Sequence, residues 1–212
     1  TSALFDGARI DHLVGLYRIY TRPVDGAGEN VFSPPEEPDQ RRLGAAILGI
    51  YMQSGIEIVA EDLGTVPPFV RLSMAELGVP GFKVMRWERD WHAAGRPFVD
   101  PETYPALSAS MTGTHDTEPL ALWWARAPRD ERAALVALPF FAEQGAADPD
   151  QPWTGLFGDL LAMLAYRSGS DELFLPIQDL FGWSDRVNTP GTVGPENWTW
   201  ALPWPVDRFG DQ

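Results

Sequence analysis

The sequence contains no cysteine, so disulfide bonds and thiolate metal sites are both excluded. It has no run of about 18 apolar residues, so no segment is expected to cross a membrane as a helix. Basic residues are scarce, with 16 lysines and arginines against 30 acidic residues and a net charge of −14. Nucleic acids and anionic membranes attract basic surfaces, so neither is an expected partner, and a neutral substrate fits this charge better than an anionic one.

What the chain does have is enough apolar sequence to fold. Its 212 residues are 44% hydrophobic, which suits one large domain or a piece of one. The first residue is Thr1 rather than methionine and a strand is predicted from Phe5, so we expect the later part of something longer. Nine tryptophans are many for this length. Tryptophan rings either fill a core or stack on the C–H faces of sugars, and composition leaves both open.

Three short segments share one pattern, a predicted strand that ends in an acidic residue. The segment Ile56–Gly64 is an apolar run that ends in Glu61 and Asp62, which is typical of a buried parallel strand leading into a functional loop. The segments FDGARID and SMTGTHD end in the same way, at Asp11 and Asp116. The spacings are 61 − 11 = 50 and 116 − 61 = 55 residues. In β/α barrels the catalytic side chains follow the carboxyl ends of strands, so these three acids are the candidate catalytic residues.

Between these segments the pattern alternates strand and helix. The predicted strands are Phe5–Asp11, Ile56–Ala60, Gly81–Trp87, Ser110–Thr114 and Leu173–Ile177. The predicted helices are Asp39–Ser54, Thr65–Leu77, Thr117–Arg126, Asp130–Gln144 and Thr154–Ser168, and His12–Pro38 is predicted to be irregular. In the first helix, Leu43, Ala46, Ile47 and Ile50 form the stripe that is expected to face inward. Five strands cannot close an eight-stranded barrel, so the first and last should not pair, and Val59 and Val84 should be exposed.

The residues beside the acids each allow two interpretations. Arg9 lies two residues before Asp11 on the same face of the strand, where its guanidinium would favour an ionised nucleophile or form an ordinary ion pair. His115 is either a hydrogen-bonded core residue or part of the site. Trp87 lies at the C-terminal end of the predicted Gly81–Trp87 strand and Trp91 in the loop after it, and both are candidates for stacking on sugar, or for packing.

Seven motifs, in family order, resemble those of the 4-α-glucanotransferases, also called amylomaltases or disproportionating enzymes, of the glycoside hydrolase family 77 type. They are DGARIDHLVG (Asp6–Gly15), AEDLG (Ala60–Gly64), GVPGFKV (Gly78–Val84), TGTHD (Thr112–Asp116), PIQD (Pro176–Asp179), NTPGT (Asn188–Thr192) and NWTW (Asn197–Trp200). The sequence departs from the family at Leu13 and Val14, where an aromatic residue and an arginine are usual.

The resemblance implies an α/β fold, with residues 1–212 forming about strands 4–8 of a TIM (β/α)8 barrel whose N-terminal strands are missing. It implies transfer of α-1,4-glucan segments between maltooligosaccharides of starch or glycogen through a covalent glycosyl-enzyme. Asp11 would be the nucleophile, Glu61 the general acid/base and Asp116 the transition-state stabiliser, with Arg9 and His115 also contacting substrate. The family implies no metal, no cofactor and a cytoplasmic location. The alternatives are a retaining α-glucan hydrolase, a non-catalytic glucan-binding chain or an inactive fragment.

Overall fold

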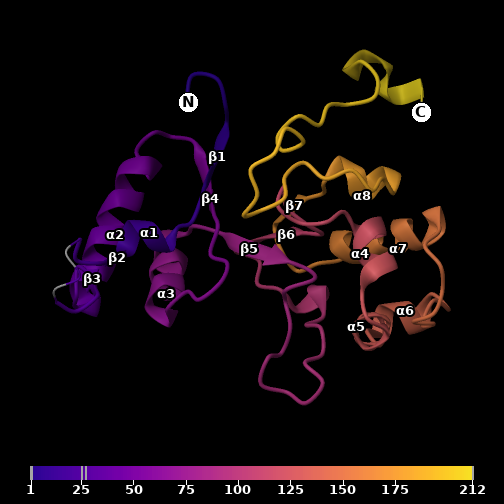
Figure 1. Cartoon of the computed structure of the whole chain (residues 1–212), viewed down its shortest axis with the longest axis horizontal. Helices are drawn as coiled ribbons and strands as arrows, with labels where there is room; N and C mark the ends of the chain where they lie inside the picture. Colours follow the sequence, from indigo (N-terminus) through magenta and orange to yellow (C-terminus); the bar gives the residue numbers. More distant parts are fainter. Residues whose placement is uncertain (1, 25, 27, 212) are drawn as a thin grey trace. The chain divides into compact units, whose positions relative to one another are not determined.

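The computed structural model describes residues 2–24, 26 and 28–211. Among these residues the main sheet has the strand order β1-β4-β5-β6-β7, and β1 and β7 are its two end strands (Figure 1). The strands are β1 (Gly7–Ile10), β4 (Glu57–Ala60), β5 (Gly81–Val84), β6 (Ser108–Met111) and β7 (Glu172–Phe174). The pairs β1–β4 and β4–β5 are parallel. Each of the five predicted strands overlaps one of these strands, and the first and last do not pair, as expected. The bounds differ: the strand predicted over Ser110–Thr114 lies at Ser108–Met111, and the one predicted over Gly81–Trp87 ends at Val84.

The chain divides into two compact units, and the first comprises residues 1–83, 104–109 and 169–172. It contains helices α1 (Val14–Tyr17), α2 (Glu37–Met52) and α3 (Pro68–Leu77), besides β1, β4 and most of β5. Helix α3 ends at Leu77, as predicted, and Gly78 follows it in the left-handed conformation with φ of 71°. The apolar core of this unit includes Leu13, Tyr17, Leu48, Ile58, Ala60, Phe69, Val70 and Met74.

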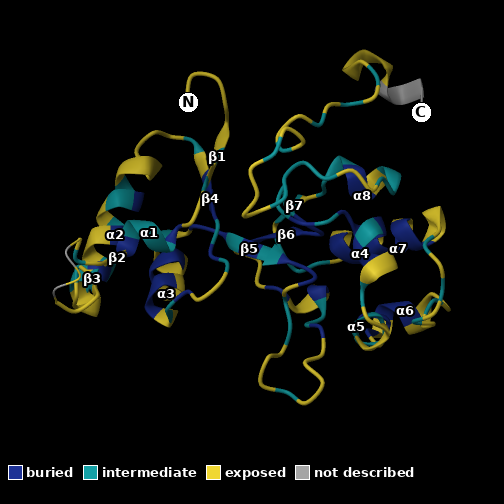
Figure 2. Ribbon diagram, in the orientation of Figure 1, coloured by how far each residue is buried: buried dark blue, intermediate teal, exposed yellow. Residues whose placement is uncertain are grey.

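Two predictions for the first unit are wrong. The segment expected to be irregular, His12–Pro38, contains helix α1 and an antiparallel hairpin of β2 (Ile19–Thr21) and β3 (Val31–Ser33). Helix α2 buries Gln40, Gly44 and Leu48, whereas Leu43 and Ile50 of the predicted inward stripe are exposed (Figure 2). The reason is a close approach of α1. The ring of Tyr17 lies where a Cβ at position 44 would be, so the helix turns its small residue toward it.

The second unit comprises residues 84–103, 110–168 and 173–212. Its helices are α4 (Leu120–Arg126), α5 (Arg129–Val136), α6 (Pro139–Glu143), α7 (Gly155–Tyr166) and α8 (Ile177–Phe181), with 3-10 turns at Pro101–Thr103 and Val206–Asp211. Its core is rich in aromatic side chains, including Trp123, Trp124, Phe140, Phe141 and Phe157. Two of the nine tryptophans, Trp123 and Trp124, therefore fill the core, which is one of the two roles that the composition allowed.

Proline and capping residues set the helix ends of this unit. The single helix predicted over Asp130–Gln144 is two helices, because Pro139 cannot donate the hydrogen bond that would continue α5 and instead begins α6. Thr154 caps α7 by accepting a hydrogen bond from Phe157 N at 3.1 Å. Pro176 lies beyond the end of β7 and immediately before α8, which corrects the strand predicted through Ile177.

Both faces of the sheet are covered at the positions that were expected to be exposed. Val59 is 8% exposed and Val84 is fully buried, so that prediction is wrong. Buried side chains in consecutive positions, as at Ile58, Val59 and Ala60, are typical of parallel strands with both faces packed. Among the described residues no helix is both long and apolar enough to span a bilayer.

Candidate active site

Asp11 and Glu61 directly follow two neighbouring strands of the first unit. Ile10 is paired with Ala60 in the parallel register of β1 and β4, so the next residue of each strand is one of the two acids. Glu61 N donates a hydrogen bond to Ile10 O at 2.9 Å, and Leu13 N donates to Glu61 O at 3.1 Å. These two hydrogen bonds continue the pairing of β1 and β4 past the ends of the strands, so both acids lie at the same edge of the sheet.

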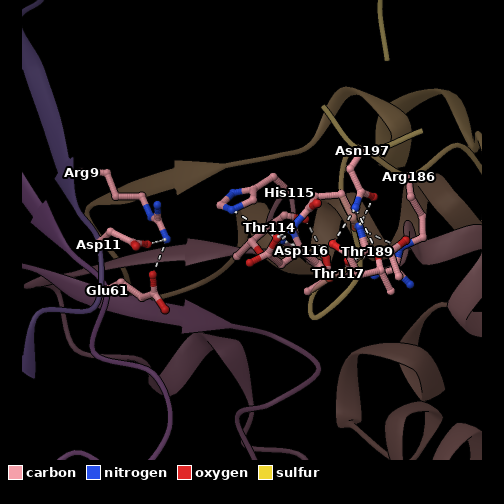
Figure 3. A network of polar contacts seen from close by, with 12 residues as sticks. Arg9, Asp11, Glu61, Thr114, His115, Asp116, Thr117, Arg186, Thr189 and Asn197 are labelled. Carbon is pink, nitrogen blue, oxygen red and sulfur yellow. Dashed lines mark hydrogen bonds and ion pairs between the residues drawn. The ribbon is translucent and has the colours of Figure 1, made fainter. Parts of the chain in front are cut away.

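One arginine nitrogen contacts both carboxylates. Arg9 Nη2 lies 2.7 Å from Asp11 Oδ1 and also pairs with Glu61 Oε2 (Figure 3). The predicted Arg9–Asp11 pair is therefore present, and it extends to the second acid. Two oxygens that contact one nitrogen atom must be close neighbours, well short of the ~6.5–9.5 Å between the carboxyl groups of inverting glycosidases. The Arg9 guanidinium in turn lies over the ring of Phe82, 5.5 Å from its centroid.

The two acids differ in environment. The side chain of Asp11 is 75% exposed and that of Glu61 only 22%. Burial raises the pKa of Glu61 above its ordinary value, and a hydrogen bond with Asp11 raises it further, while the charge of Arg9 opposes both effects. A carboxyl group with a raised pKa holds its proton longer and can act as a general acid.

Asp62, the other acid of the motif, has a different setting. It is buried, and its carboxylate accepts hydrogen bonds from Phe82 N at 2.8 Å and from Arg71 Nε at 2.8 Å. Arg71 also donates to the main-chain oxygen of Asp62 at 2.9 Å. Gly81 packs so closely on this carboxylate that a Cβ there would lie 2.7 Å from Oδ1. Asp62 therefore joins β4, α3 and β5, which leaves Glu61 as the acid available for chemistry.

Asp116 and His115 belong to the second unit. Asp116 Oδ1 accepts a hydrogen bond from Asn188 Nδ2 at 2.6 Å and lies 3.4 Å from His115 Nε2. Arg186 Nη2 donates to the main-chain oxygen of Asp116 at 2.8 Å. The ring of His115 lies over that of Trp198, with centroids 4.9 Å apart. Asp116 belongs to a different unit from Asp11 and Glu61, so its catalytic role beside them stays a prediction.

The sequence patterns did not predict the contacts of Asp116 with the C-terminal segment. Arg186 lies in none of the motifs, and nothing local linked Asn188 to an acid 72 residues away. The motifs NTPGT and NWTW marked the segment but not its contacts. Trp198 is 63% exposed.

Trp87 and Trp91 are not core residues. They are 42% and 58% exposed, and the guanidinium of Arg96 lies 5.7 Å from the Trp91 ring. Their part in stacking on sugar or in packing stays a prediction. A search of the described residues reveals no cluster of three or more histidine or acidic side chains suited to a metal ion.

The second unit also contains a buried acid, Asp179, that joins several of its elements. Asp179 accepts hydrogen bonds from Thr112 Oγ1 at 2.5 Å and from Leu120 N at 2.6 Å, and so joins the end of β6 to α4 and α8. Burial raises the pKa of Asp179, while these two hydrogen bonds and the charge of Arg86 oppose the shift. Arg86 is itself buried over the ring of Trp123 and donates to Glu118 O.

Comparison with known proteins agrees with the motifs. The family model described as 4-alpha-glucanotransferase matches residues 1–206. A 4-alpha-glucanotransferase from Chlamydia caviae is 31% identical over 95% of this chain and 38% of its own length. One from Mycobacterium bovis is 32% identical over 92% of this chain and 29% of its own length. The chain thus spans about two fifths or less of these relatives.

A comparison with solved structures bears on the fold. An amylomaltase from Streptococcus agalactiae, solved in complex with acarbose, superposes with a TM-score of 0.69 at 24% identity, covering 94% of this chain and 38% of that one. At this identity the likeness shows the fold alone, a partial barrel of the amylomaltase type. Together with the match over residues 1–206, these findings show that the chain belongs to the 4-alpha-glucanotransferase family.

Proposed function

We propose that this chain carries the catalytic acids of a 4-alpha-glucanotransferase, which transfers segments of α-1,4-glucan between maltooligosaccharides. The observation that supports it best is the pair of acids at adjacent strand ends, Asp11 and Glu61, held by one nitrogen of Arg9. Their closeness is suited to a retaining double displacement, in which one carboxylate attacks the sugar and the other moves the proton. We further propose that the five strands correspond to strands 4–8 of a (β/α)8 barrel formed with chain outside residues 1–212.

In the first step Glu61 donates its proton to the glycosidic oxygen, and Asp11 attacks the anomeric carbon as that bond breaks. The products are a glycosyl ester on Asp11 and a shortened glucan. In the second step Glu61, now ionised, takes a proton from a sugar hydroxyl of the acceptor, whose oxygen displaces Asp11. The raised pKa of Glu61 supports its role as the acid, and the contact with Arg9 favours an ionised Asp11.

The remaining residues would bind and stabilise the sugar. Asp116, with His115 beside it, would hold hydroxyl groups of the reacting glucose more tightly as it becomes oxocarbenium-like. Trp87 and Trp91 would stack on glucose units of the donor or acceptor, which is consistent with their exposure. Starch or glycogen fragments and a cytoplasmic setting belong to this proposal.

Product analysis on maltotriose tests the proposal. We expect the full-length protein to give glucose plus a ladder of longer oligomers, whereas simple shortening would indicate the retaining hydrolase. Asp11→Asn and Glu61→Gln should each remove transfer, by at least the ~10²–10⁴-fold typical of acid–base groups. Matched controls are Asp159→Asn on α7 and Glu29→Gln before β3, both exposed and outside the site. Binding without turnover in the wild type would favour a glucan-binding chain, and turnover by Glu61→Gln would move the acid/base role elsewhere.

A further inference from the structure

The C-terminal segment contacts Asp116 through a short series of hydrogen bonds. Asn188 approaches it twice, since its side chain donates to Asp116 Oδ1 at 2.6 Å and its main-chain nitrogen donates to His115 O at 3.1 Å. Arg186 adds a hydrogen bond to the main-chain oxygen of Asp116 and another to Asn188 O, at 2.8 and 3.2 Å. The pair formed by His115 and Asp116 is therefore fixed from one side by residues 186–188.

Asn197 holds the loop that presents Asn188. Its Oδ1 accepts a hydrogen bond from Thr189 N at 3.0 Å, and its Nδ2 donates to Thr192 O and Oγ1 at 3.2 and 3.0 Å. Thr192 Oγ1 also donates to Thr189 O at 2.7 Å. One amide side chain thus closes residues 189–192 into a compact turn next to Asn188. The labelled side chains of Thr189 and Asn197 lie together with Asp116 in Figure 3.

The contacts of the Asp116 carboxylate are one-sided. Among the residues that the structure describes, its polar contacts from Asn188 and His115 both go to Oδ1. The side chain is 40% exposed, so Oδ2 is the oxygen left for a substrate hydroxyl. The donor is a neutral amide, which fixes the orientation of the carboxylate while leaving its full negative charge to act on a positively charged transition state.

We propose that Asn188 is a positioning residue for Asp116, and that Asn197 holds it in place through the 189–192 turn. This inference rests on the proposed function, because it gives Asp116 the transition-state role. Removing the donor by Asn188→Ala should lower kcat by about 10- to 100-fold with little change in KM, because a hydrogen bond to a charged group is lost and the affected interaction forms in the transition state. Asn197→Ala should act in the same direction with a smaller loss.

Asn188→Asp gives a pH signature that a purely structural role would not produce. Two carboxyl groups at this 2.6 Å contact cannot both ionise easily, so they share a proton at low pH and repel at high pH. With the proton in place, the introduced carboxyl donates an O–H to Oδ1 as the amide does. Relative to the wild type, activity should therefore recover as pH falls. His115 and Arg186 are the basic side chains facing this pair, with Glu118 beyond Arg186 at 3.6 Å.

The experiment compares the full-length wild type with Asn188→Ala, Asn188→Asp and the matched control Asn30→Asp, an exposed residue between β2 and β3. Kinetics on maltotriose are recorded across pH, with thermal midpoints for each variant. In the wild type, the Asn188 side-chain amide signal in NMR, assigned by its loss in Asn188→Ala, should shift as Asp116 is protonated.

Each outcome supports or overturns the inference. Low kcat in Asn188→Ala at unchanged thermal midpoint, together with acid recovery in Asn188→Asp alone, supports it. A wild type that transfers glucan while both Asn188 variants behave like Asn30→Asp overturns this inference and leaves the proposed function intact. A wild type without transfer overturns the proposed function. An Asn188 amide signal that is insensitive to pH overturns the contact itself, whatever the activity.

Discussion

Replacing Gly81 with alanine tests how firmly Asp62 is held beside Glu61. A Cβ at position 81 would lie 2.7 Å from Asp62 Oδ1, whereas ordinary contact begins at 3.4 Å. The carboxylate must therefore move by at least 3.4 − 2.7 = 0.7 Å. If it moves away from Phe82 N, their 2.8 Å hydrogen bond lengthens to 2.8 + 0.7 = 3.5 Å, the outer limit for such a bond.

The expected cost follows from this displacement. Losing a hydrogen bond to a charged group destabilises a protein by about 1.5–3 kcal/mol. Replacing a glycine restricts the unfolded chain and returns roughly 0.4–1 kcal/mol. We expect Gly81→Ala to lower the free energy of unfolding by about 1–2 kcal/mol, the difference between these effects. The matched control is Gly49→Ala in α2, where a Cβ meets no atom within 4 Å. Gly49→Ala should instead raise the free energy of unfolding by roughly 0.5–1 kcal/mol.

The assay is urea unfolding of the full-length protein followed by tryptophan fluorescence, with the urea dependence of the free energy compared between variants. A double-mutant cycle isolates the clash, because Asp62→Ala removes the carboxylate that the new methyl group would strike. In the Asp62→Ala protein, Gly81→Ala should leave the free energy of unfolding unchanged or raise it slightly. An equal cost in both backgrounds would refute a clash with Asp62, and a neutral Gly81→Ala in the wild type would show that the carboxylate moves freely.

Three further predictions concern the site and the fold. Glu61→Gln should be more stable than the wild type at neutral pH and equal to it near pH 3. Because the pKa of Glu61 is raised in the folded protein, the folded chain binds more protons than the unfolded one between the unfolded and folded pKa values of Glu61, and the wild type loses stability as pH rises through that window. Parallel pH curves of the unfolding midpoints of the two proteins would contradict this. Alanine at Trp87 or Trp91 should raise KM for maltooligosaccharides with little change in thermal midpoint, since both rings are exposed; a lower midpoint at constant KM would restore a packing role. Thr154→Ala should lower the free energy of unfolding by about 1 kcal/mol, because the side chain that caps α7 is lost. Thr154→Ser keeps a capping hydroxyl and should retain most of the wild-type stability. An alanine variant as stable as the wild type would contradict the cap.

Local chemistry was enough to predict the five strands of the main sheet and the contact between Arg9 and Asp11, though not α1 or the β2–β3 hairpin. The strands ending at Asp11 and Glu61 were recognisable because a short apolar run followed by acids and glycine is a local pattern. The contact between Arg9 and Asp11 followed from a spacing of two residues. Gly78 ended α3 as expected because few residues other than glycine adopt its backbone conformation.

Tertiary packing decided what periodicity could not. The apolar pattern of α2 favoured Leu43 and Ile50 as its buried face, but contact with Tyr17 required the face that carries Gly44. The resemblance singled out Glu61 of two adjacent acids, but only the packing of Arg71 and Gly81 on Asp62 revealed what the second acid contacts. Asn188 reaches Asp116 across 72 residues, and no pattern within either segment specifies that contact. A helix or strand is determined by neighbours within a few residues, whereas the face it buries and the partner of each polar group depend on segments that only folding brings together.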